Sequence, residues 1–175
     1  MCCLRTVCDK FEKRCFVRIL VVSDTHGDLY TLREVITKQR TAEVVIHLGD
    51  GADEFELLRP DYPEKMFLGV RGNCDFGSDL PHTETMTIEG KKIYYTHGYV
   101  QRVKLGRYDL LREARSAKAD ICLFGHTHRA MTDYDDGLYI LNPGTLSRSR
   151  GGGKPSYGIV DITSGGIFTK IMQPI

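Results

Sequence analysis

The sequence repeats one arrangement several times: a short apolar run of strand length that ends beside a glycine with an aspartate, an asparagine or a histidine. VRILVVS at 17–23 is the first such run, and EVVIHLGD at 43–50 is the second. Between them, LYTLREVITKQR at 29–40 places its apolar residues on one face at helical spacing. Short branched apolar runs are typical of strands that are buried on both faces. The pattern therefore predicts strand, loop, helix and strand, and with them an α/β fold.

The same alternation continues further along the chain. We predict further strands, a second long helix and a strand-rich end, in the segments MFLGVRGNCD (66–75), KKIYYTHG (91–98), LGRYDLLREARSAKA (105–119, the helix), DICLFGHTH (120–128), MTDY (131–134), LYILN (138–142), YGIVDI (157–162) and IFTKIM (167–172). Turn signals at Asp136-Gly137 and Ser164-Gly165-Gly166 separate the last strands. Strands that alternate with helices early and follow one another late predict two packed sheets flanked by helices.

Length and charge limit the function classes. The 175 residues are 41% hydrophobic, which suits one globular domain. The net charge of +1 offers no bulk attraction to membranes or to long nucleic acids, and the chain has no Trp. No run approaches the roughly 18 apolar residues of a membrane span, and the N-terminal segment carries charge where a signal peptide is apolar. We expect a soluble, cytoplasmic protein with neither a membrane nor a long nucleic acid as partner, and the sequence leaves a homo-oligomer open.

The cysteines are concentrated at the N-terminus, where Cys2, Cys3, Cys8 and Cys15 precede the first predicted strand. Their spacing lacks the paired two-residue gaps of a zinc ribbon, so a metal site there is the weaker alternative. We expect residues 1–16 to be a disordered N-terminal extension and residues 17–175 to form a single domain.

Side chains that bind metals follow five of the predicted strands. In open α/β sheets, ligands bind where the strands end, so these side chains can converge on one place. Seven ligands are too many for one ion with an open position, but they suit two ions that share a bridging carboxylate. A set of nitrogen and oxygen ligands favours Mn, Fe, Ni or Zn. The seven residues are Asp24, His26, Asp50, Asn73, His97, His126 and His128.

Each of these motifs is weak by itself, because Gly-Asp and Gly-Asn pairs are ordinary turn residues. The distribution of the histidines favours the site for two metal ions, since four of the six histidines follow predicted strands. Of the other two, His47 lies inside the second strand and is interpreted as a hydrogen-bonded core histidine that supports the site. His82 is interpreted as a loop residue.

The ordered motifs resemble those of the calcineurin-like metallophosphoesterase superfamily, and within it the YfcE-type phosphodiesterases. The resemblance runs from about Val17 to the C-terminus and implies a four-layer β-sandwich flanked by helices, in the α/β class. The motifs are Asp24-x-His26, Gly49-Asp50-x-x-Asp53, Gly72-Asn73-Cys74-Asp75, His97-Gly98, Gly125-His126-x-His128 and Asn142-Pro143-Gly144-Thr145.

The resemblance also implies a role for each residue. Asp24, His26, Asp50 and His128 would hold the first metal, and Asp50, Asn73, His97 and His126 the second, with Asp50 bridging. The implied enzyme is a dinuclear, metal-dependent phosphodiesterase, in which a hydroxide that bridges the ions attacks a small phosphodiester. Manganese is the first expectation, with iron, nickel and zinc as alternatives. Asp50 and Asn73 would be catalytic, and Asn73 and Cys74 would contact the substrate.

One position departs from many members of the superfamily, notably the protein phosphatases. They carry Gly-Asn-His where this chain has Gly72-Asn73-Cys74, and that histidine is the usual candidate to protonate the leaving group. A thiol with a pKa of about 8.5 and weak hydrogen bonding is a poor substitute. The departure favours diesters with acidic leaving groups over alkyl monoesters.

Three alternatives stay open. The retromer coat's small subunit shares the fold but is a protein-interaction scaffold, and such a scaffold is expected to have lost ligands. A nuclease for short nucleotides would keep the enzyme. Arg148, Arg150 and Lys154 flank the glycine run at 151–153 and form either a phosphate-steering loop or a solvated loop with incidental charge.

Overall fold

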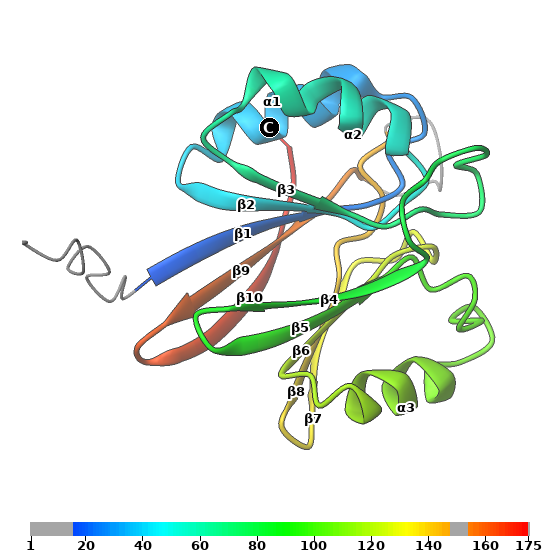
Figure 1. Cartoon of the computed structure of the whole chain (residues 1–175), viewed down its shortest axis with the longest axis vertical. Helices are drawn as coiled ribbons and strands as arrows, with labels where there is room; N and C mark the ends of the chain where they lie inside the picture. The colour runs from blue at the N-terminus through cyan, green and yellow to red at the C-terminus, as the bar shows by residue number, and fades with distance from the viewer. Residues whose placement is uncertain (1–15, 148–153, 175) are drawn as a thin grey trace, which may run out of the picture.

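The computed structural model describes residues 16–147 and 154–174. Two five-stranded sheets pack face to face, with helices against the outer face of each (Figure 1). The order of the layers is therefore helices, sheet, sheet, helix. The expected four-layer α/β sandwich is confirmed.

Three parallel strands form the centre and one edge of the first sheet: β1 (Phe16–Val22), β2 (Ala42–His47) and β3 (Met66–Gly69). Two antiparallel strands, β9 (Tyr157–Thr163) and β10 (Gly166–Met172), complete the order β10, β9, β1, β2, β3. β1 is thus covered on both edges, as its unbroken apolar run predicts.

The second sheet also has a parallel centre, with antiparallel strands at both edges. β5 pairs with β6 and β6 with β8 in parallel, so that the order is β4, β5, β6, β8, β7. The bounds are β4 Thr83–Ile88, β5 Lys91–Thr96, β6 Ile121–Phe124, β7 Met131–Asp135 and β8 Leu138–Asn142.

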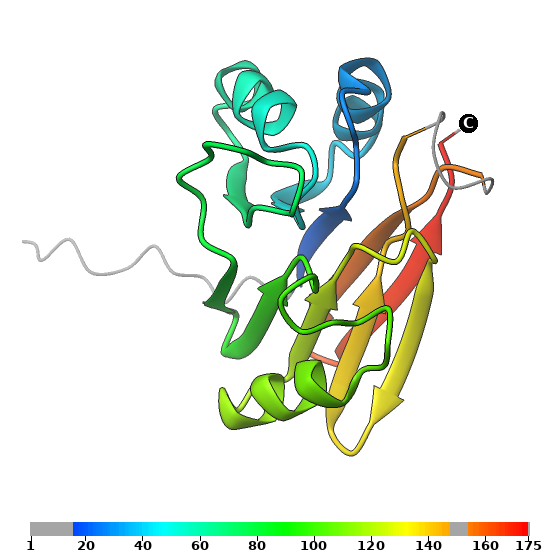
Figure 2. The same cartoon turned by 90° about the vertical axis from the view of Figure 1, so that its right-hand side faces the viewer.

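Helices α1 (Leu29–Lys38) and α2 (Ala52–Leu58) cover the first sheet, and one turn of 3-10 helix, Arg59–Asp61, follows α2. Helix α3 (Tyr108–Ser116) covers the second sheet (Figure 2). The predicted helices are confirmed at α1 and α3. Neither α2 nor the partly exposed edge strand β4 was predicted.

The largest core cluster lies between the two sheets and joins them. Ile19 and Ile46 from the first sheet pack there with Ile93 and Leu123 from the second, and all four are fully buried. Separate apolar clusters fill the space under α1 and α2 and the space under α3. The loops at the ends of the central strands therefore extend from sheets that are closely packed on both faces.

Some expectations fall outside the described residues. These are the cysteine-rich segment 1–15, Arg148, Arg150 and the glycine run at 151–153. Lys154 is described and is exposed, and β1 begins at Phe16, one residue before the expected start of the domain. None of the described helices is long and apolar enough to cross a membrane.

Candidate metal centre

The loops that follow β1, β2, β3, β5 and β6 meet at one end of the two sheets. Backbone hydrogen bonds tie them together across the chain: the amide of Asp24 donates to the carbonyl of Gly49 at 2.9 Å, and that of Gly125 donates to the carbonyl of His97 at 3.0 Å. The His126 amide donates to Asp24 Oδ2 at 3.1 Å, which joins a loop of the second sheet to one of the first. The structure therefore brings the predicted motifs to one place.

Glycines allow these loops to touch. A Cβ on Gly72 would collide with the side chain and amide of Asp50, and a Cβ on Gly49 would collide with the backbone of Gly72. A Cβ on Gly125 would strike the hydroxyl of Ser23. The glycines beside the candidate ligands are thus required because atoms of a neighbouring loop lie where their side chains would be.

Five of the seven candidate ligands have a left-handed backbone. This conformation costs a residue with a side chain roughly 1–2 kcal/mol, and such strain gathers at functional sites. The φ values are 55° at Asp24, 47° at His26, 56° at Asp50, 64° at His126 and 58° at His128.

The first ligand group is Asp24, His26 and His128, whose ligand atoms all lie within 4.8 Å of one another. The two Nε2 atoms of the histidines are 3.3 Å apart, and Asp24 Oδ1 is 3.0 Å from His128 Nε2. Asp24 Oδ1 is fully buried and accepts no hydrogen bond from the described residues. A buried carboxylate oxygen without a donor, facing two imidazole nitrogens, is what a bound cation would satisfy.

The second group is Asp50, His97 and His126, which meets the same 4.8 Å limit. His97 Nε2 lies 3.1 Å from His126 Nδ1 and 3.5 Å from Asp50 Oδ2. Its other ring nitrogen, Nδ1, faces the Leu48 carbonyl at 2.7 Å and donates to it. That hydrogen bond orients the ring so that Nε2 points into the site. Asn73 joins this group, with Oδ1 3.2 Å from His97 Nε2.

Asp50 faces both groups. Its Oδ2 is 4.0 Å from His26 Nε2 as well as 3.5 Å from His97 Nε2, while its Oδ1 accepts the Cys74 amide at 2.7 Å. Burial acts to raise the pKa of Asp50, but the His97 imidazole and the Cys74 amide outweigh it and hold the pKa well below its usual range. Asp50 is therefore an ionised carboxylate placed between two clusters of nitrogen ligands.

The charges of Asp24 and His126 suit metal ligation. Burial acts to raise the pKa of Asp24, but the imidazoles of His128 and His97 and the Ser23 hydroxyl lower it. Burial, the charge of His97 and that of Lys104 lower the pKa of His126 to about 4, so that its ring is neutral at pH 7. Ionised carboxylates and neutral imidazoles are the forms that bind divalent metals. Burial acts to lower the pKa of His97, but the carboxylates of Asp50 and Asp24 outweigh it and raise this pKa, so a metal bound there would displace a proton from the His97 ring.

Comparison with known proteins agrees with this geometry, because residues 17–165 match the calcineurin-like phosphoesterase superfamily domain. The chain belongs to this superfamily. The probable metallophosphoesterase YsnB of Bacillus subtilis is 32% identical over 148 residues, which cover 83% of this chain and 85% of YsnB. The phosphodiesterase YfcE of Escherichia coli K12 is 27% identical, over 83% of this chain and 88% of YfcE.

Solved structures agree on the fold. A crystal structure of a predicted phosphoesterase from Streptococcus pneumoniae TIGR4 has a TM-score of 0.77 at 30% identity, covering 91% of this chain and 90% of that one. Vacuolar Protein Sorting 29 from Cryptosporidium parvum has a TM-score of 0.72 at 18% identity, over 90% of this chain and 97% of that one. The superfamily is metal-dependent, and this chain presents candidate metal ligands.

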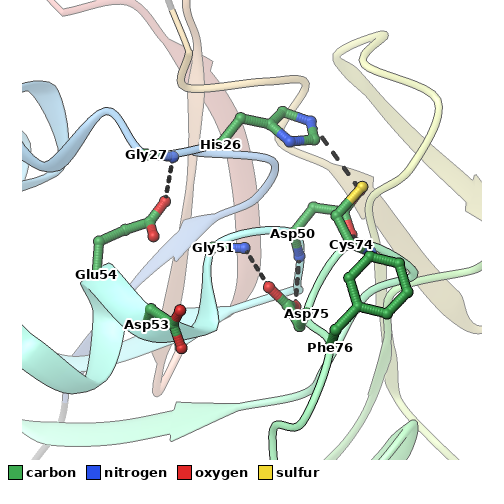
Figure 3. Close-up of a pocket in the computed structure, with 9 residues that line it drawn as sticks. All are labelled: His26, Gly27, Asp50, Gly51, Asp53, Glu54, Cys74, Asp75 and Phe76. Carbon is green, nitrogen blue, oxygen red and sulfur yellow. Dashed lines mark hydrogen bonds and ion pairs between the residues drawn. The ribbon is translucent and has the colours of Figure 1, made fainter.

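One contact of this metallophosphoesterase site is not predictable from the sequence. The thiol of Cys74 lies within 4.8 Å of ligand atoms of both His26 and Asp50, although the expected ligand set contained no sulfur. Cys74 is exposed, and Asn73 Nδ2 lies 3.4 Å from its Sγ. The spacing of Gly72-Asn73-Cys74 gives no sign of where the thiol points, since that depends on the fold of the loop (Figure 3).

Asp75 has a structural role that its motif in the sequence does not indicate. Its carboxylate accepts backbone amides from Asp50, Gly51 and Ala52 at 2.8 to 2.9 Å and from Gly72 at 2.6 Å. One side chain thus fastens the loop after β3 to the loop after β2 (Figure 3). Glu54 acts similarly, accepting the Thr25 hydroxyl at 2.7 Å and the Gly27 amide at 2.6 Å.

The two remaining histidines lie as interpreted. His47 is fully buried, and its Nδ1 accepts the Gly49 amide at 3.1 Å while its Nε2 lies 3.1 Å from the Thr25 hydroxyl. His82 lies outside the strands, immediately before β4, with Nε2 3.0 Å from the Arg71 guanidinium.

The last motif supports the site from behind. Asn142 donates to the Gly125 carbonyl at 2.9 Å and to the Thr127 hydroxyl at 3.1 Å, and Thr145 donates to the Asp24 carbonyl at 2.8 Å. These bonds hold the loops that carry Asp24 and His126 in their strained conformations.

A cavity of about 450 Å³ opens beside the ligands. His26, Asp50 and Cys74 line it, together with the exposed ring of Phe76 and the carboxylate of Asp53 (Figure 3). A small ligand bound at the candidate metal centre would have room to extend in this direction.

Proposed function

We propose that this protein is a dinuclear, metal-dependent phosphodiesterase that hydrolyses small phosphodiesters. The observation that carries the proposal is the pair of ligand groups with Asp50 between them. Asp24, His26 and His128 would hold one ion, and His97, His126 and Asn73 the other. The fit of the first group is supported by the buried Asp24 oxygen that lacks a donor.

When bound, such ions supply Lewis-acid polarisation of the phosphate and lower the pKa of the water that attacks it. The chain's own residues set the charge of the site and the orientation of its ligands. Asp50 stays ionised and faces both groups, and His97 is oriented by the Leu48 carbonyl. Asn73 is a neutral ligand, so it limits the negative charge that an anionic substrate meets. These features support hydrolysis of an anionic ester, with manganese as the first metal to test.

Cys74 supports diesters with acidic leaving groups as the substrate class. Its exposed thiol lies where the cavity meets the ligands, and a thiol is a weak hydrogen-bond donor. A leaving group that departs readily as an anion needs no donor, whereas an alkoxide does. Asn73 and Cys74 would therefore contact the ester without protonating it.

The test begins with metal content. We expect close to two equivalents of manganese per chain after reconstitution, measured by elemental analysis, and turnover of bis(p-nitrophenyl) phosphate that far exceeds turnover of alkyl monoesters. Asp50→Asn keeps an oxygen for the Cys74 amide but removes the charge. We expect it to lower metal content and to reduce turnover by about 10²-fold or more. Mutation of a side chain that only orients a metal ligand already costs up to about 10²-fold in activity, and mutation of the ligand itself should cost at least as much.

Asp53→Asn is the matched control. It removes the same charge from an exposed carboxylate at the cavity edge, so metal content and turnover should stay close to wild type. A single equivalent in a fully active protein contradicts the dinuclear site. Absence of bound metal and of turnover favours an interaction scaffold instead, and activity confined to short oligonucleotides favours the nuclease alternative.

A further inference from the structure

A second cavity, of about 370 Å³, is lined in part by Thr127 and Arg129, from the loop that carries His126 and His128. Its apolar part is formed by Val103 and Phe124, which are buried, and by Met131. It lies between the loop after β5 and the loop after β6, on the face of the second sheet that α3 covers. It has the size of a small-molecule pocket.

The cavity is cationic. Lys104, Arg107 and Arg129 all line it. Arg107 is paired with Asp133 at 2.9 Å, whereas Lys104 and Arg129 form no salt bridge with any residue of 16–147 or 154–174. Two positive charges at an apolar hollow, without a carboxylate between them, make a site that attracts an anion.

The cavity borders the loop that carries two of the candidate ligands. Thr127 lines it and stands between His126 and His128 in the chain. Tyr99, in the loop after β5 that also carries Val103 and Lys104, packs edge-on against the ring of His126 with centroids 5.5 Å apart. The cavity therefore lies beside the loop segment that holds His126 and His128.

The two cavities differ in charge. The one beside Cys74 is lined by the carboxylates of Asp53, Glu54 and Asp75, and the one beside Thr127 by cations. A phosphodiester held at the ligands has two ester arms, and each cavity can receive one of them. An arm with an anionic group is repelled on the Cys74 side and attracted on the Thr127 side.

We propose that the cavity beside Thr127 is a subsite for a second phosphate, carried by the arm of the substrate that is not released. Lys104 and Arg129 would bind this phosphate by charge-assisted hydrogen bonds, and Val103, Phe124 and Met131 would contact the adjoining carbon skeleton. The inference rests on the proposed phosphodiesterase activity and specifies its substrate class, which is a diester of a bisphosphorylated compound.

A matched pair of substrates tests the subsite. Thymidine 5′-(p-nitrophenyl phosphate) and its 3′-phosphorylated form release the same p-nitrophenol from the same ester and differ only in the second phosphate. We expect the 3′-phosphorylated form to have a KM about tenfold lower on the manganese-loaded protein, since tenfold is the effect of one favourable charged contact. Equal KM values for the two substrates overturn the inference.

Variants assign the effect to the cavity. Lys104→Ala and Arg129→Ala should each lower the ratio of the two KM values from about ten toward equality. Lys104→Arg should keep the ratio near ten, because the positive charge is kept. Lys170→Ala is the control, since it removes an equal charge from an exposed position on β10 and should leave the preference and the activity as in wild type. A preference that persists in the Lys104→Ala, Arg129→Ala double variant contradicts the assignment.

Binding gives a readout that does not need turnover. Calorimetry should show thymidine 3′,5′-bisphosphate binding about tenfold tighter than thymidine 5′-monophosphate, with the difference lost in the double variant. If neither ester is hydrolysed but this difference is found, the proposed function fails and the subsite stands. If both esters are hydrolysed and the nucleotides bind equally, the proposed function stands and the subsite is wrong.

Discussion

The side chain of Cys74 limits what kind of ester this site can cleave. A departing alkoxide needs a proton, and a positioned acid is worth about 10² to 10⁴ in rate. Cys74 lines the cavity beside Asp50, where the superfamily's phosphatases are expected to carry histidine. An ordinary thiol has a pKa of about 8.5 and donates weak hydrogen bonds. Help to the leaving group should thus be largely missing in this chain.

We predict that the rate of hydrolysis falls steeply as the pKa of the leaving group rises, and that Cys74→His flattens this dependence. The measurement is turnover of a series of substituted phenyl and alkyl diesters by both proteins. Cys74→Ser is the control and should change turnover of the aryl diesters little, because it introduces no better acid at neutral pH. A flat dependence in the wild type would mean that another residue supplies the proton.

His47 affects the stability of the protein and its dependence on pH. Its ring is buried, and its two nitrogens face Gly49 and Thr25. Burial is the main cause that lowers its pKa to about 4, from about 6.5 in an unfolded chain. Between these two values, the unfolded state binds a proton that the folded state does not. The stabilising contribution of neutral His47 is therefore complete above pH 6.5 and is lost as the pH falls toward 4.

We predict that acidification from pH 7 to pH 4.5 lowers the free energy of unfolding by about 2–3 kcal/mol more in the wild type than in His47→Asn. Asparagine can still accept the Gly49 amide, so the turn after β2 should be kept. Urea titrations at both pH values, in the presence of a chelator that removes the effect of bound metal, measure the difference. Equal losses in the two proteins would show that His47 does not contribute.

At the scale of elements, the sequence predicts helices and strands whose stabilising residues lie within or next to them. It does not predict an element that depends on residues distant in the chain. The strand β1 and the helix α1 have complete signals in their own residues: an unbroken apolar run, and an amphipathic face preceded by the capping residue Asp28. Helix α2 has only Gly51 before it, and no side chain of its own caps it. The amides at its start donate instead to Asp75, 23 and 24 positions along the chain.

The site divides in the same way. Convergence of the five loops was predictable, because the carboxyl ends of neighbouring parallel strands lie at one edge. The position of the Cys74 thiol was not, since it depends on contacts between the loop after β3 and the loop after β2. Strand β4 was missed because it is an edge strand with only Met86 and Ile88 packed on the core.

These loop contacts lead to a prediction for the glycines. Gly72→Ala places a Cβ against Asp50 and should force the two loops apart, which would reduce metal binding and cost about 1–3 kcal/mol of stability. Gly77→Ala is the control, because Gly77 has φ +82° and open space around it. It should cost about 1 kcal/mol by backbone strain alone and leave metal binding intact. Metal titrations and urea unfolding of both variants separate loop contact from general instability.

At the scale of the whole molecule, the candidate centre joins the two sheets. Asp24, Asp50 and Asn73 follow strands of the first sheet, whereas His97, His126 and His128 follow strands of the second. The apolar cluster between the sheets already holds them together without metal. Bound ions would add links between loops of both sheets at one end, so they should stabilise a protein that is already folded.

We predict that adding manganese to the chelator-treated protein raises its melting temperature. At a free concentration of about 100 times the Kd, binding adds about 2.7 kcal/mol, and about 2–4 °C per kcal/mol for a chain of this size gives a rise of roughly 5–11 °C. The rise should be largely lost in Asp50→Asn and kept in Asp53→Asn, because only Asp50 faces both ligand groups. Hydrogen exchange should locate the added protection at residues 24–28, 48–51, 97–98 and 125–128, with little change in β10 or at the end of α3. An equal rise in both variants, or protection spread evenly over the sheets, would show that manganese stabilises the protein from another place.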